Sequence, residues 1–595
     1  MSLPARWLGA LGLLLSLAVG APLAHAQDDP TAAGTDEPSL PLPDADGQLD
    51  PQGPAPDEPV DVAPDIEPGS TPDRGVQGSS GPTLHGELAL SLEEAIRMGL
   101  ENNLDVEVVR FAPYIAEEQV TEAWGAYDPT LFSDFAYQNI QLENSFQIND
   151  QPLSKDKEWA GEGGFQGIVP LLGSSYTLSY ASGQFETNST VESLSPKYET
   201  TFNIGVSQPL LRNLIWNQPW FQVRTSKIAY GASLDQFATD VMNVVQQIQN
   251  LYWNLIARED QVRVAEKSLQ TAEALLEQTK TQHDVGVVSR VEVVEAEAGV
   301  AQRDFELIRA SNLYRNSQDQ LIDAVLGEGL TADSTLQIQP TDRPDEFIPF
   351  DIDPSLAVER AFESRPEVDL ANKEIEQRQV SLAYAKNQRL PALDARVSWG
   401  NQGLSGSENP NLDCRFGATR PACQLPPPAP PLVPTQPTDW ANSYSRFLTK
   451  DAAEQFIVGG FFSIPIPNTS PRARVSQAEL ELRRATSQKK RLEQSIILEV
   501  RTAVRNLADS QKGIEAARRA RVAAEEQLRA ERIRLEYGES TPFDVLLRES
   551  DLVQAQSEEI NAFQVYRTST TGLDRAQGTI LRNSNISIDA VRALR

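Results

Sequence analysis

The sequence predicts a mainly helical fold with β-strands, in which one helix–strand–long-helix unit is written twice. Three observations support this prediction. Two stretches of equal length, residues 219–286 and 471–538, contain no proline after their first residue. The segments that flank them correspond to each other in the same order. Before each long stretch, apolar and polar residues alternate with the period of a β-strand.

The composition of the chain excludes several classes of protein. The chain has 595 residues and a mass of 65.4 kDa, with 52 Lys and Arg against 84 Asp and Glu, a formal net charge of −32. So acidic a chain repels the phosphates of DNA and RNA, and nucleic acid is therefore not an expected partner. With two Cys and three His, the sequence lacks the ligands of a cysteine-rich zinc module and leaves little room for His-based catalysis.

The first 26 residues have the features of a secretory signal peptide. Arg6 supplies a positive charge, residues 8–19 form an apolar core, and Ala24-His25-Ala26 fits a cleavage site. A retained membrane anchor is the alternative, but the core is shorter than the roughly 20 residues that cross a bilayer. Since no other stretch approaches 18 uninterrupted apolar residues, a place in a membrane would depend on β-strands.

Residues 27–86 are expected to form a disordered leader. They contain 12 of the 40 prolines, 13 acidic residues, a single basic residue, Arg74, and no aromatic residue. A segment of this composition cannot bury enough apolar surface to offset the entropy lost on ordering.

The chain beyond the leader has the pattern of a duplication. Residues 90–131 align without a gap with residues 352–393, and the sequence around Gly286 matches that around Gly538. We therefore expect a first repeat at 87–330, a linker at 331–351, a second repeat at 352–582 and a C-terminal tail at 583–595. Chance similarity between two helical stretches is the alternative, which the matching order of the segments disfavours.

Each repeat is expected to contain one very long helix. Residues 219–286 and 471–538 would each form roughly 100 Å of helix, at about 1.5 Å per residue. Apolar residues recur along them at helical spacing, for example Val241, Val245 and Ile248. Such helices need neighbours along their whole length. The shorter helices expected at 92–125 and 289–326, and at 356–387 and 541–581, match that length when placed end to end, which predicts a bundle two helices thick with coiled-coil character.

Alternating segments predict strands at one end of these helices. Residues 176–180, 202–207 and 393–399 alternate, so that one face of each strand is apolar and the other polar. Their aromatic residues and the signal peptide favour membrane strands over the strands of a soluble sandwich. The polar loop between residues 400 and 455 holds Cys414 and Cys423, which we expect to form a disulfide in an oxidising compartment. A metal site there would need ligands that the loop lacks.

In this order, the features resemble the TolC family of outer-membrane efflux proteins. The resemblance covers about residues 88–582 and is carried by residues 92–103, by Gln208-Pro209-Leu210-Leu211 and by the turns at Gly286 and Gly538. It implies a homotrimer in the outer membrane of a Gram-negative-type cell. Each copy would add its helices to a trimeric periplasmic α-helical tunnel and four strands to a transmembrane β-barrel that caps it.

The resemblance also assigns roles to the two turns. They would be periplasmic tips that contact an adaptor (membrane fusion) protein driven by an inner-membrane pump, and the expected contact residues are Gly286, Val287, Ser289, Gly538, Glu539 and Thr541. Glu292 and Asp544 each follow a turn glycine by six residues. In a trimer each would form a ring of three carboxylates at the pore constriction, which attracts cations. The alternative for both is an acid that stabilises the helix dipole at the start of a helix.

Two departures from the family pattern leave points open. The first repeat has room for four strands, at about 130–142, 160–170, 174–186 and 199–209. Either an extra hairpin decorates the barrel, or the number of strands differs from the family's usual twelve per trimer. The positions that match a Tyr and an Arg of the family's closed-tip lock are Leu535 and Ser540, so that lock is not expected here.

The leading functional hypothesis is a passive export duct without a cofactor. An enzyme is disfavoured, because His283, at a helix reversal, is the only His beyond the signal peptide and leader, and no nucleophile triad, phosphate loop or metal spacing is present. A periplasmic coiled-coil scaffold or adaptor without a barrel is the second alternative. The sequence leaves open whether the cargo is a drug, a metal or a protein of a type I secretion system.

Overall fold

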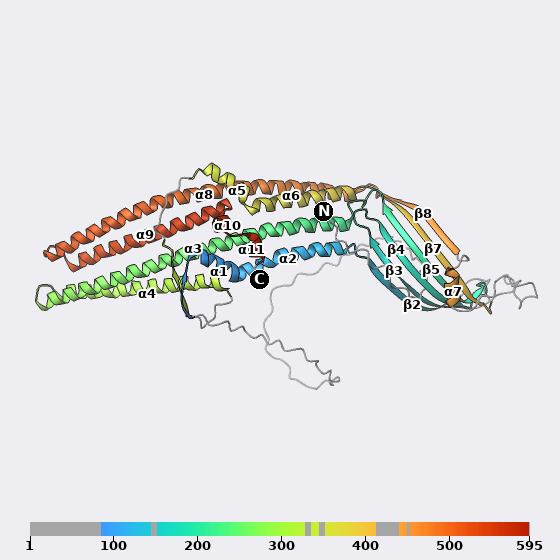
Figure 1. The fold of residues 1–595 in the computed structure, drawn as a ribbon, viewed down its shortest axis with the longest axis horizontal. Coiled ribbons are helices and arrows are strands. Elements are labelled where there is room, and N and C mark those ends of the chain that lie inside the picture. Colours follow the sequence, from blue (N-terminus) through green and yellow to red (C-terminus); the bar gives the residue numbers. More distant parts are fainter. Residues whose placement is uncertain are drawn as a thin grey trace, which may run out of the picture. The chain divides into compact units, whose positions relative to one another are not determined.

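The helices follow the predicted order. A computed structural model describes residues 85–143, 152–327, 335–343, 352–411, 440–448 and 453–593, all of which belong to one compact unit (Figure 1). The helices of the first series are α1 (Leu92–Asn102), α2 (Leu104–Gly125), α3 (Gln218–Asp284) and α4 (Arg290–Leu326). Those of the second series are α5 (Pro354–Ser364), α6 (Pro366–Gln388), α8 (Thr469–Glu536), α9 (Pro542–Gln577) and α10 (Ile580–Asn583). Among the described helices, none has the length and hydropathy that a bilayer crossing requires.

Three of the predicted helices are each divided in two, which corrects the predicted spans. Residues 92–125 form α1 and α2, because Asn103 has an extended backbone and caps α2 by accepting a hydrogen bond from Val106 N at 3.2 Å. Residues 356–387 are divided before Pro366, since the residue preceding a proline avoids helical geometry. The third helix ends at Gly578, whose φ of 73° is the left-handed conformation that glycine tolerates.

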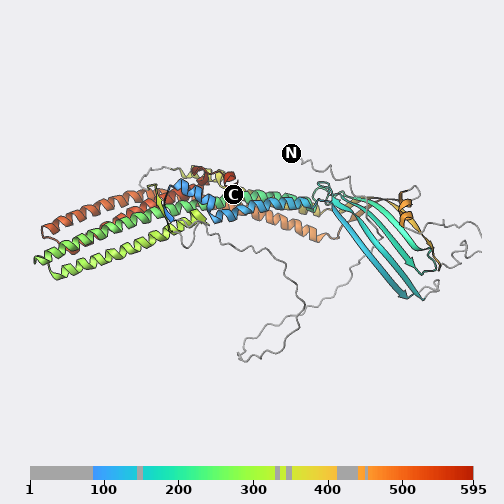
Figure 2. The ribbon, with the colours of Figure 1, turned by 60° about the horizontal axis from the view of Figure 1, so that its bottom comes forward.

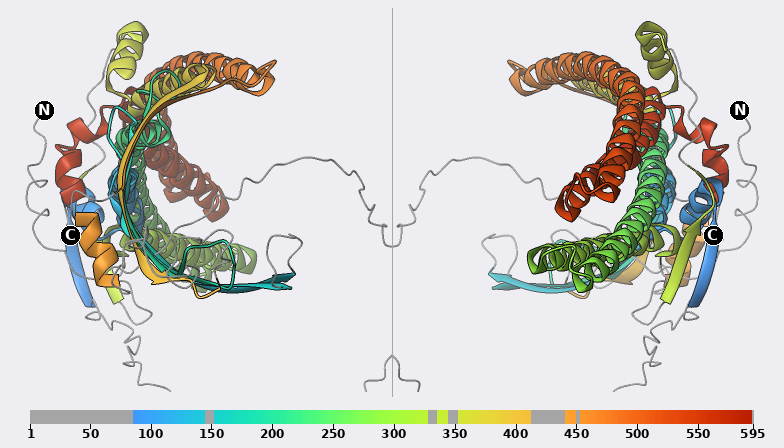
Figure 3. Two further views of the ribbon diagram at one scale, coloured as in Figure 1. Left: turned by 90° about the vertical axis from the view of Figure 1, so that its right-hand side faces the viewer. Right: turned by 90° about the vertical axis from the view of Figure 1, so that its left-hand side faces the viewer.

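The long helices α3 and α8 pack against one set of shorter helices near the strands and against another set farther away. α2 and α6 pack on α3, and α6 also packs on α8, so that the row near the strands is α2–α3–α6–α8. Farther from the strands, α4 and α9 pack on α3 and α9 packs on α8. Figures 2 and 3 show these helices side by side in a curved row. Two shorter helices lie beside each long one, as predicted, but together they form a curved row instead of a bundle two helices thick. The duplication itself stays a prediction.

Two apolar clusters hold the helices together. The larger is built on α3, where Phe237, Ile248 and Tyr252 are buried against α1, α4 and a short parallel strand pair, β1 (His85–Leu90) and β6 (Thr335–Pro340). The smaller joins α8 to α5 and α9, around Ile496 and Phe563. Because the helices form a thin layer, these clusters are small, and polar side chains make many of the other contacts between helices.

A buried ion cluster joins the second series of helices to α3. Arg365, at the start of α6, donates to Glu367 at 3.0 Å and to Glu499 of α8 at 2.7 Å. Arg575 of α9 donates to the same Glu367 at 2.9 Å and to Asn243 of α3 at 2.8 Å. Burial alone would raise the pKa of Glu367, but hydrogen bonds from Arg365 and the charge of Arg575 outweigh it and hold that pKa at about 2.

A six-stranded antiparallel sheet follows the helices. Its strand order is β2-β3-β4-β5-β7-β8. The strands are β2 (Thr130–Glu143), β3 (Leu153–Ile168), β4 (Ser175–Thr187), β5 (Leu194–Pro209), β7 (Ala392–Glu408) and β8 (Ala453–Ser463). The four predicted strands of the first repeat are confirmed, and β8 was not predicted. The sheet of one chain therefore has six strands, whereas the resemblance implies four strands per copy.

Other predicted boundaries also need correction. The leader was expected to extend to residue 86, but β1 begins at His85. The predicted linker at 331–351 contains β6, and the predicted tail at 583–595 contains α11 (Ile588–Ala593). The predicted loop after residue 400 is shorter, because β7 extends to Glu408 and α7 (Trp440–Leu448) precedes β8. Cys414 and Cys423, the predicted disulfide pair, lie outside the described residues.

The ion cluster gives a stability prediction. Replacement Glu367→Gln removes the carboxylate shared by two arginines and should lower stability by about 3–5 kcal/mol at pH 7. Because the folded pKa is depressed, this stabilisation is present above the unfolded pKa of about 4.3 and is lost as pH falls towards 2. Thermal unfolding of both proteins between pH 7 and pH 3 measures the difference, which should shrink on acidification.

Glu499→Gln is the matched control, because the Glu499 side chain is 47% exposed and makes one of these contacts. Its unfolding temperature should fall much less. Equal losses for the two variants would mean that Glu367 has no special role.

Candidate functional site

The six strands present one continuous apolar face. Directly paired residues of an antiparallel sheet point to the same side, so the register assigns each side chain to a face. Ile204 of β5 lies opposite Trp399 of β7 and Leu178 of β4. The same face includes Leu131, Phe135, Tyr137, Trp159, Phe165, Tyr176, Tyr180, Phe202, Val206, Leu393, Val397, Phe456, Val458 and Phe462.

This face is strongly exposed. Phe135 is 70% exposed, Val458 66% and Phe456 65%. A contiguous apolar surface of this extent is unstable in water and is the kind of surface that contacts lipid or another protein. Alternation between an apolar and a polar face, with aromatics near the ends, is the pattern of membrane β-strands.

The opposite face of the sheet carries most of its acidic residues, although the two edge strands also place Phe132, Ile140, Ile457 and Phe461 there. Asp134 lies opposite Glu162, and Gln138 lies opposite Glu158, on β2 and β3. The same side carries Lys197, Glu199, Asp394 and Arg396. A charged face of this kind lines the water-filled interior of transmembrane barrels.

The short helix α7 lies on the apolar face, at the end of the sheet away from the long helices (Figure 1). Ser443 is buried and donates to Gly403 O at 3.0 Å, while Trp440 packs on Tyr198 with ring centroids 5.2 Å apart. Its outer side exposes Tyr444 and Leu448, the latter by 64%. Amphipathic aromatic residues at this position suit the boundary between lipid and water.

The two predicted tips lie at the other end of the long helices (Figure 1). Gly286 and Gly538 have φ of 80° and 75°, which the tight reversals from α3 to α4 and from α8 to α9 require. The structure brings the predicted contact residues together within each turn. Near the tips, Leu275 of α3 packs with Leu528 of α8 and Val545 of α9.

Two tip residues were missed by sequence reasoning. Val285 and Tyr537 immediately precede the turn glycines and are 71% and 79% exposed; the predicted Val287 is 73% exposed. Their exposure could have been predicted from the sequence, because an apolar residue beside an exposed turn glycine has no neighbour to bury it. The tips therefore carry apolar groups fit for contact with a partner.

Glu292 and Asp544, predicted for the pore constriction, both act in helix caps. The Oε1 atom of Glu292 accepts from Ser289 N at 3.4 Å and from Ser289 Oγ at 3.1 Å. In α9, Thr541 Oγ1 donates to Asp544 Oδ2 at 2.7 Å and accepts from Asp544 N at 3.2 Å. The bonds that the Thr541 hydroxyl and backbone N–H donate to the Asp544 carboxylate lower the pKa of that carboxyl. The alternative role at helix starts is thus present, and the ring of carboxylates stays a prediction.

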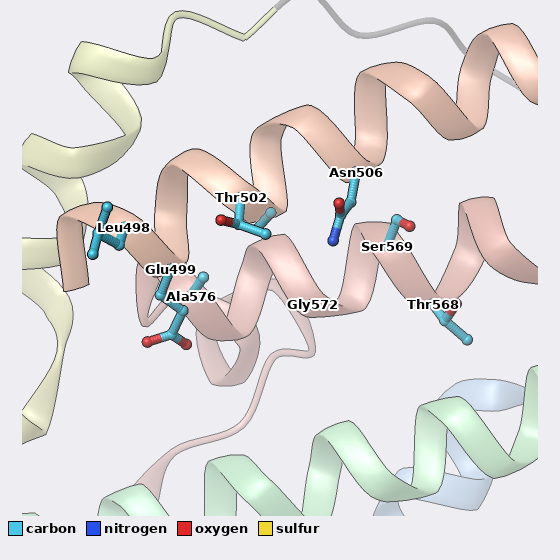
Figure 4. A pocket seen from close by; sticks show the side chains of 9 residues that line it. Leu498, Glu499, Thr502, Asn506, Thr568, Ser569, Gly572 and Ala576 are labelled. Carbon is cyan, nitrogen blue, oxygen red and sulfur yellow. The ribbon is translucent and has the colours of Figure 1, made fainter. Parts of the chain in front are cut away.

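The surface of the helices is hollowed in several places. One hollow of about 520 Å³ lies on α8 and α9 and is lined by small and polar side chains such as Thr502, Asn506 and Ser569 (Figure 4). Its acidic group, Glu499, is already paired with Arg365. Across the described ranges, no group of three or more His, Cys, Asp or Glu residues could hold a metal ion.

Comparison with known proteins identifies a family and several solved structures that this chain resembles. The family model described as "Outer membrane efflux protein" matches residues 168–327 and 357–579. Over 447 residues, 74% of this chain and 80% of the other protein, the sequence is 22% identical to outer membrane protein TolC of Escherichia coli K12. The fold is similar to the CmeC outer membrane channel of Campylobacter jejuni, with a TM-score of 0.56, 14% identity and coverage of 84% and 90% of the two chains. It is also similar to outer membrane protein VceC of Vibrio cholerae, with a TM-score of 0.55, 14% identity and coverage of 82% and 96%.

The two faces of the sheet give a prediction with a matched control. Val397→Arg puts a charge on the apolar face and should destabilise the membrane-inserted protein by about 2–4 kcal/mol. Ser398→Arg, one residue along β7, puts the same charge on the polar face and should have little effect. The amount of folded protein in isolated membranes, measured by heat-dependent migration in gels, distinguishes the two. Similar yields for both variants would mean that the apolar face does not contact lipid.

Proposed function

Because this chain belongs to the outer membrane efflux protein family, whose members are outer membrane channels, we propose that it is a passive export duct. Three copies would form a conduit from the periplasm to the exterior. The observation that carries the proposal is the two-faced sheet at the end of roughly 100 Å helices. Its apolar face suits lipid, and its polar face suits a water-filled passage.

Transport through such a duct breaks no bond, so its chemistry is electrostatic. The polar face of the sheet carries carboxylates such as Asp134, Glu158 and Glu162. The chain as a whole carries a formal net charge of −32. An acidic lumen attracts cations and repels anions within about one Debye length of the wall.

The tips would engage a periplasmic adaptor protein coupled to an inner-membrane pump. Exposed Val285, Val287 and Tyr537 supply apolar contact at the tips, beside the turn residues Ser289, Glu539 and Thr541. Aromatic and aliphatic side chains of this kind form the centre of most protein interfaces. Such an assembly serves drug or metal efflux and type I protein secretion equally well, and cross-linking of the adaptor and pump from the tips would identify which system is present.

A periplasmic scaffold or adaptor without a barrel is the second candidate. It would have to keep the apolar face of the sheet covered by protein. No described element except α7 lies on that face. Extraction separates the candidates, since a duct needs detergent to leave the outer membrane and a periplasmic scaffold does not.

Topology gives a direct test of the duct. Ser407 is the second-last residue of β7, at the end of the strand away from the long helices. In a background of Cys414→Ser and Cys423→Ser, a Ser407→Cys variant should react with a membrane-impermeant thiol reagent on intact cells. Labelling that appears only after lysis would contradict the proposed orientation.

A second test concerns Asp544 and Glu292. If they form rings at the constriction, Asp544→Ala should weaken cation selectivity and relieve block by trivalent cations in planar bilayers, and Glu292→Ala should do so more weakly. Asp544→Asn is the sharper variant, because it keeps an oxygen that can cap α9 and removes only the charge. Selectivity altered in the Ala variant and intact in the Asn variant would assign Asp544 to the helix cap alone.

A further inference from the structure

We propose that strands β2 and β3 belong to the transmembrane wall, so that three copies close an 18-stranded barrel in which β2 of one copy pairs with β8 of the next. The proposal rests on the trimeric duct proposed above. It concerns the part of the sheet that the family match leaves out, because that match begins at residue 168, the last residue of β3. The matched segments contain β4, β5, β7 and β8.

The first argument is the hydrogen-bonded register. β2 pairs with β3 without a break from Thr130 opposite Gln166 to Glu143 opposite Leu153. β3 continues into β4 without a break from Asp156 opposite Thr187 to Ile168 opposite Ser175. A hairpin that merely decorated the barrel would leave the sheet, whereas this one extends it.

The second argument is the continuity of the two faces. On β2 and β3 the exposed Phe135, Tyr137 and Trp159 lie on the same face as Val458 and its neighbours. Asp134, Glu158 and Glu162 of these two strands lie on the opposite face, and Glu143, at the end of β2, is the acidic residue that lies on the apolar side. In water the exposed aromatic residues would be a liability, but within a bilayer they are the expected outer surface of a barrel wall.

The third argument is the polarity of the two open edges. β2 runs away from the helices and β8 runs back towards them, because β2 follows α2 and β8 precedes α8. All eleven residues of β8 are exposed, and β2 is exposed along most of its length. Backbone groups on open edges cannot remain unpaired in lipid. An antiparallel junction between β8 and β2 of the next copy satisfies both edges and keeps every neighbour antiparallel.

The fourth argument is a match of circumference. Three copies of the row α2–α3–α6–α8 give twelve helices, which at 8–10 Å spacing need roughly 100–120 Å. Eighteen strands, spaced about 4.8 Å apart and tilted about 40°, need roughly 110 Å. The complete sheet therefore fits the helical ring without a large change of radius.

The ends of the hairpin suggest how to remove it. Ile168, at the end of β3, packs against Ala123 and Tyr127, which precede β2. The β2–β3 hairpin thus begins and ends beside the same apolar cluster. Deletion of residues 130–168 would join α2 to the start of β4 at the same end of the sheet.

Disulfide scanning across copies tests the seam. In a background of Cys414→Ser, Cys423→Ser and Val458→Cys, one further cysteine is placed on β2, at Leu131, Ser133, Phe135 or Tyr137, or on β4, at Tyr176, Leu178 or Tyr180. We expect oxidation to link copies through a β2 position and through none on β4. Links through β4 in an intact trimeric channel would contradict the 18-stranded barrel but would remain consistent with the proposed export duct. Absence of any link, together with absence of a trimer, would overturn both.

The width of the barrel is the second readout. Barrel diameter grows roughly in proportion to strand number, so the wild-type mouth should be roughly 1.5-fold wider than that of a 12-stranded variant. Neutral polymers of graded size, added to the outer side of a planar bilayer, should enter the wild type at radii that the 130–168 deletion variant excludes. Equal size limits for two trimeric channels would overturn the proposal. If the deletion variant does not assemble, the cross-linking result decides alone.

Discussion

One constraint governs the structure: a sheet with an apolar outer face and two open edges cannot exist alone. In a membrane every backbone donor and acceptor needs a partner within the protein, and the further copies proposed above would supply it at the edges of β2 and β8. The row of helices has open edges on the same sides as the sheet. Each edge strand is continuous with a helix at the edge of the helical row, α2 beside β2 and α8 beside β8. The sheet and the helices are thus open on the same sides and can close together.

A protein built as a curved layer has little interior, and this explains the importance of buried polar contacts. Arg365, Glu367 and Arg575 join three helices and, through Asn243, a fourth. Lys373 adds a bond from α6 to Asp235 of α3 at 2.6 Å. Such pairs hold helices at a defined spacing and angle where apolar packing is thin. Such ion pairs therefore suit a thin layer of helices that has little apolar interior.

At the tips, local structure and proposed function use the same residues. The glycines allow the reversal, and the acids at the third position of the next helix close a capping box. These caps hold both carboxylates in position, and at Asp544 the bonds from Thr541 also lower the carboxyl pKa. Both properties suit a ring of charge, so the two roles of Asp544 do not compete. The apolar Val285 and Tyr537 beside the turns remain for a partner.

The sequence by itself determined the local elements. Proline-free stretches specified the long helices, turn glycines specified the reversals, and alternation specified β4, β5 and β7, because each signal depends on neighbouring residues alone. β8 escaped, since Gly459, Gly460 and a run of apolar residues obscure its alternation. The helix break at Asn103 also escaped, although its capping bond to Val106 is local; a second hydrogen bond, from Asn103 to Ala324 O, 221 residues away, could not be seen in the sequence. Only the tertiary structure decided that six strands form one sheet and that Glu367 serves two arginines, because register and ion pairing join residues that are distant in sequence.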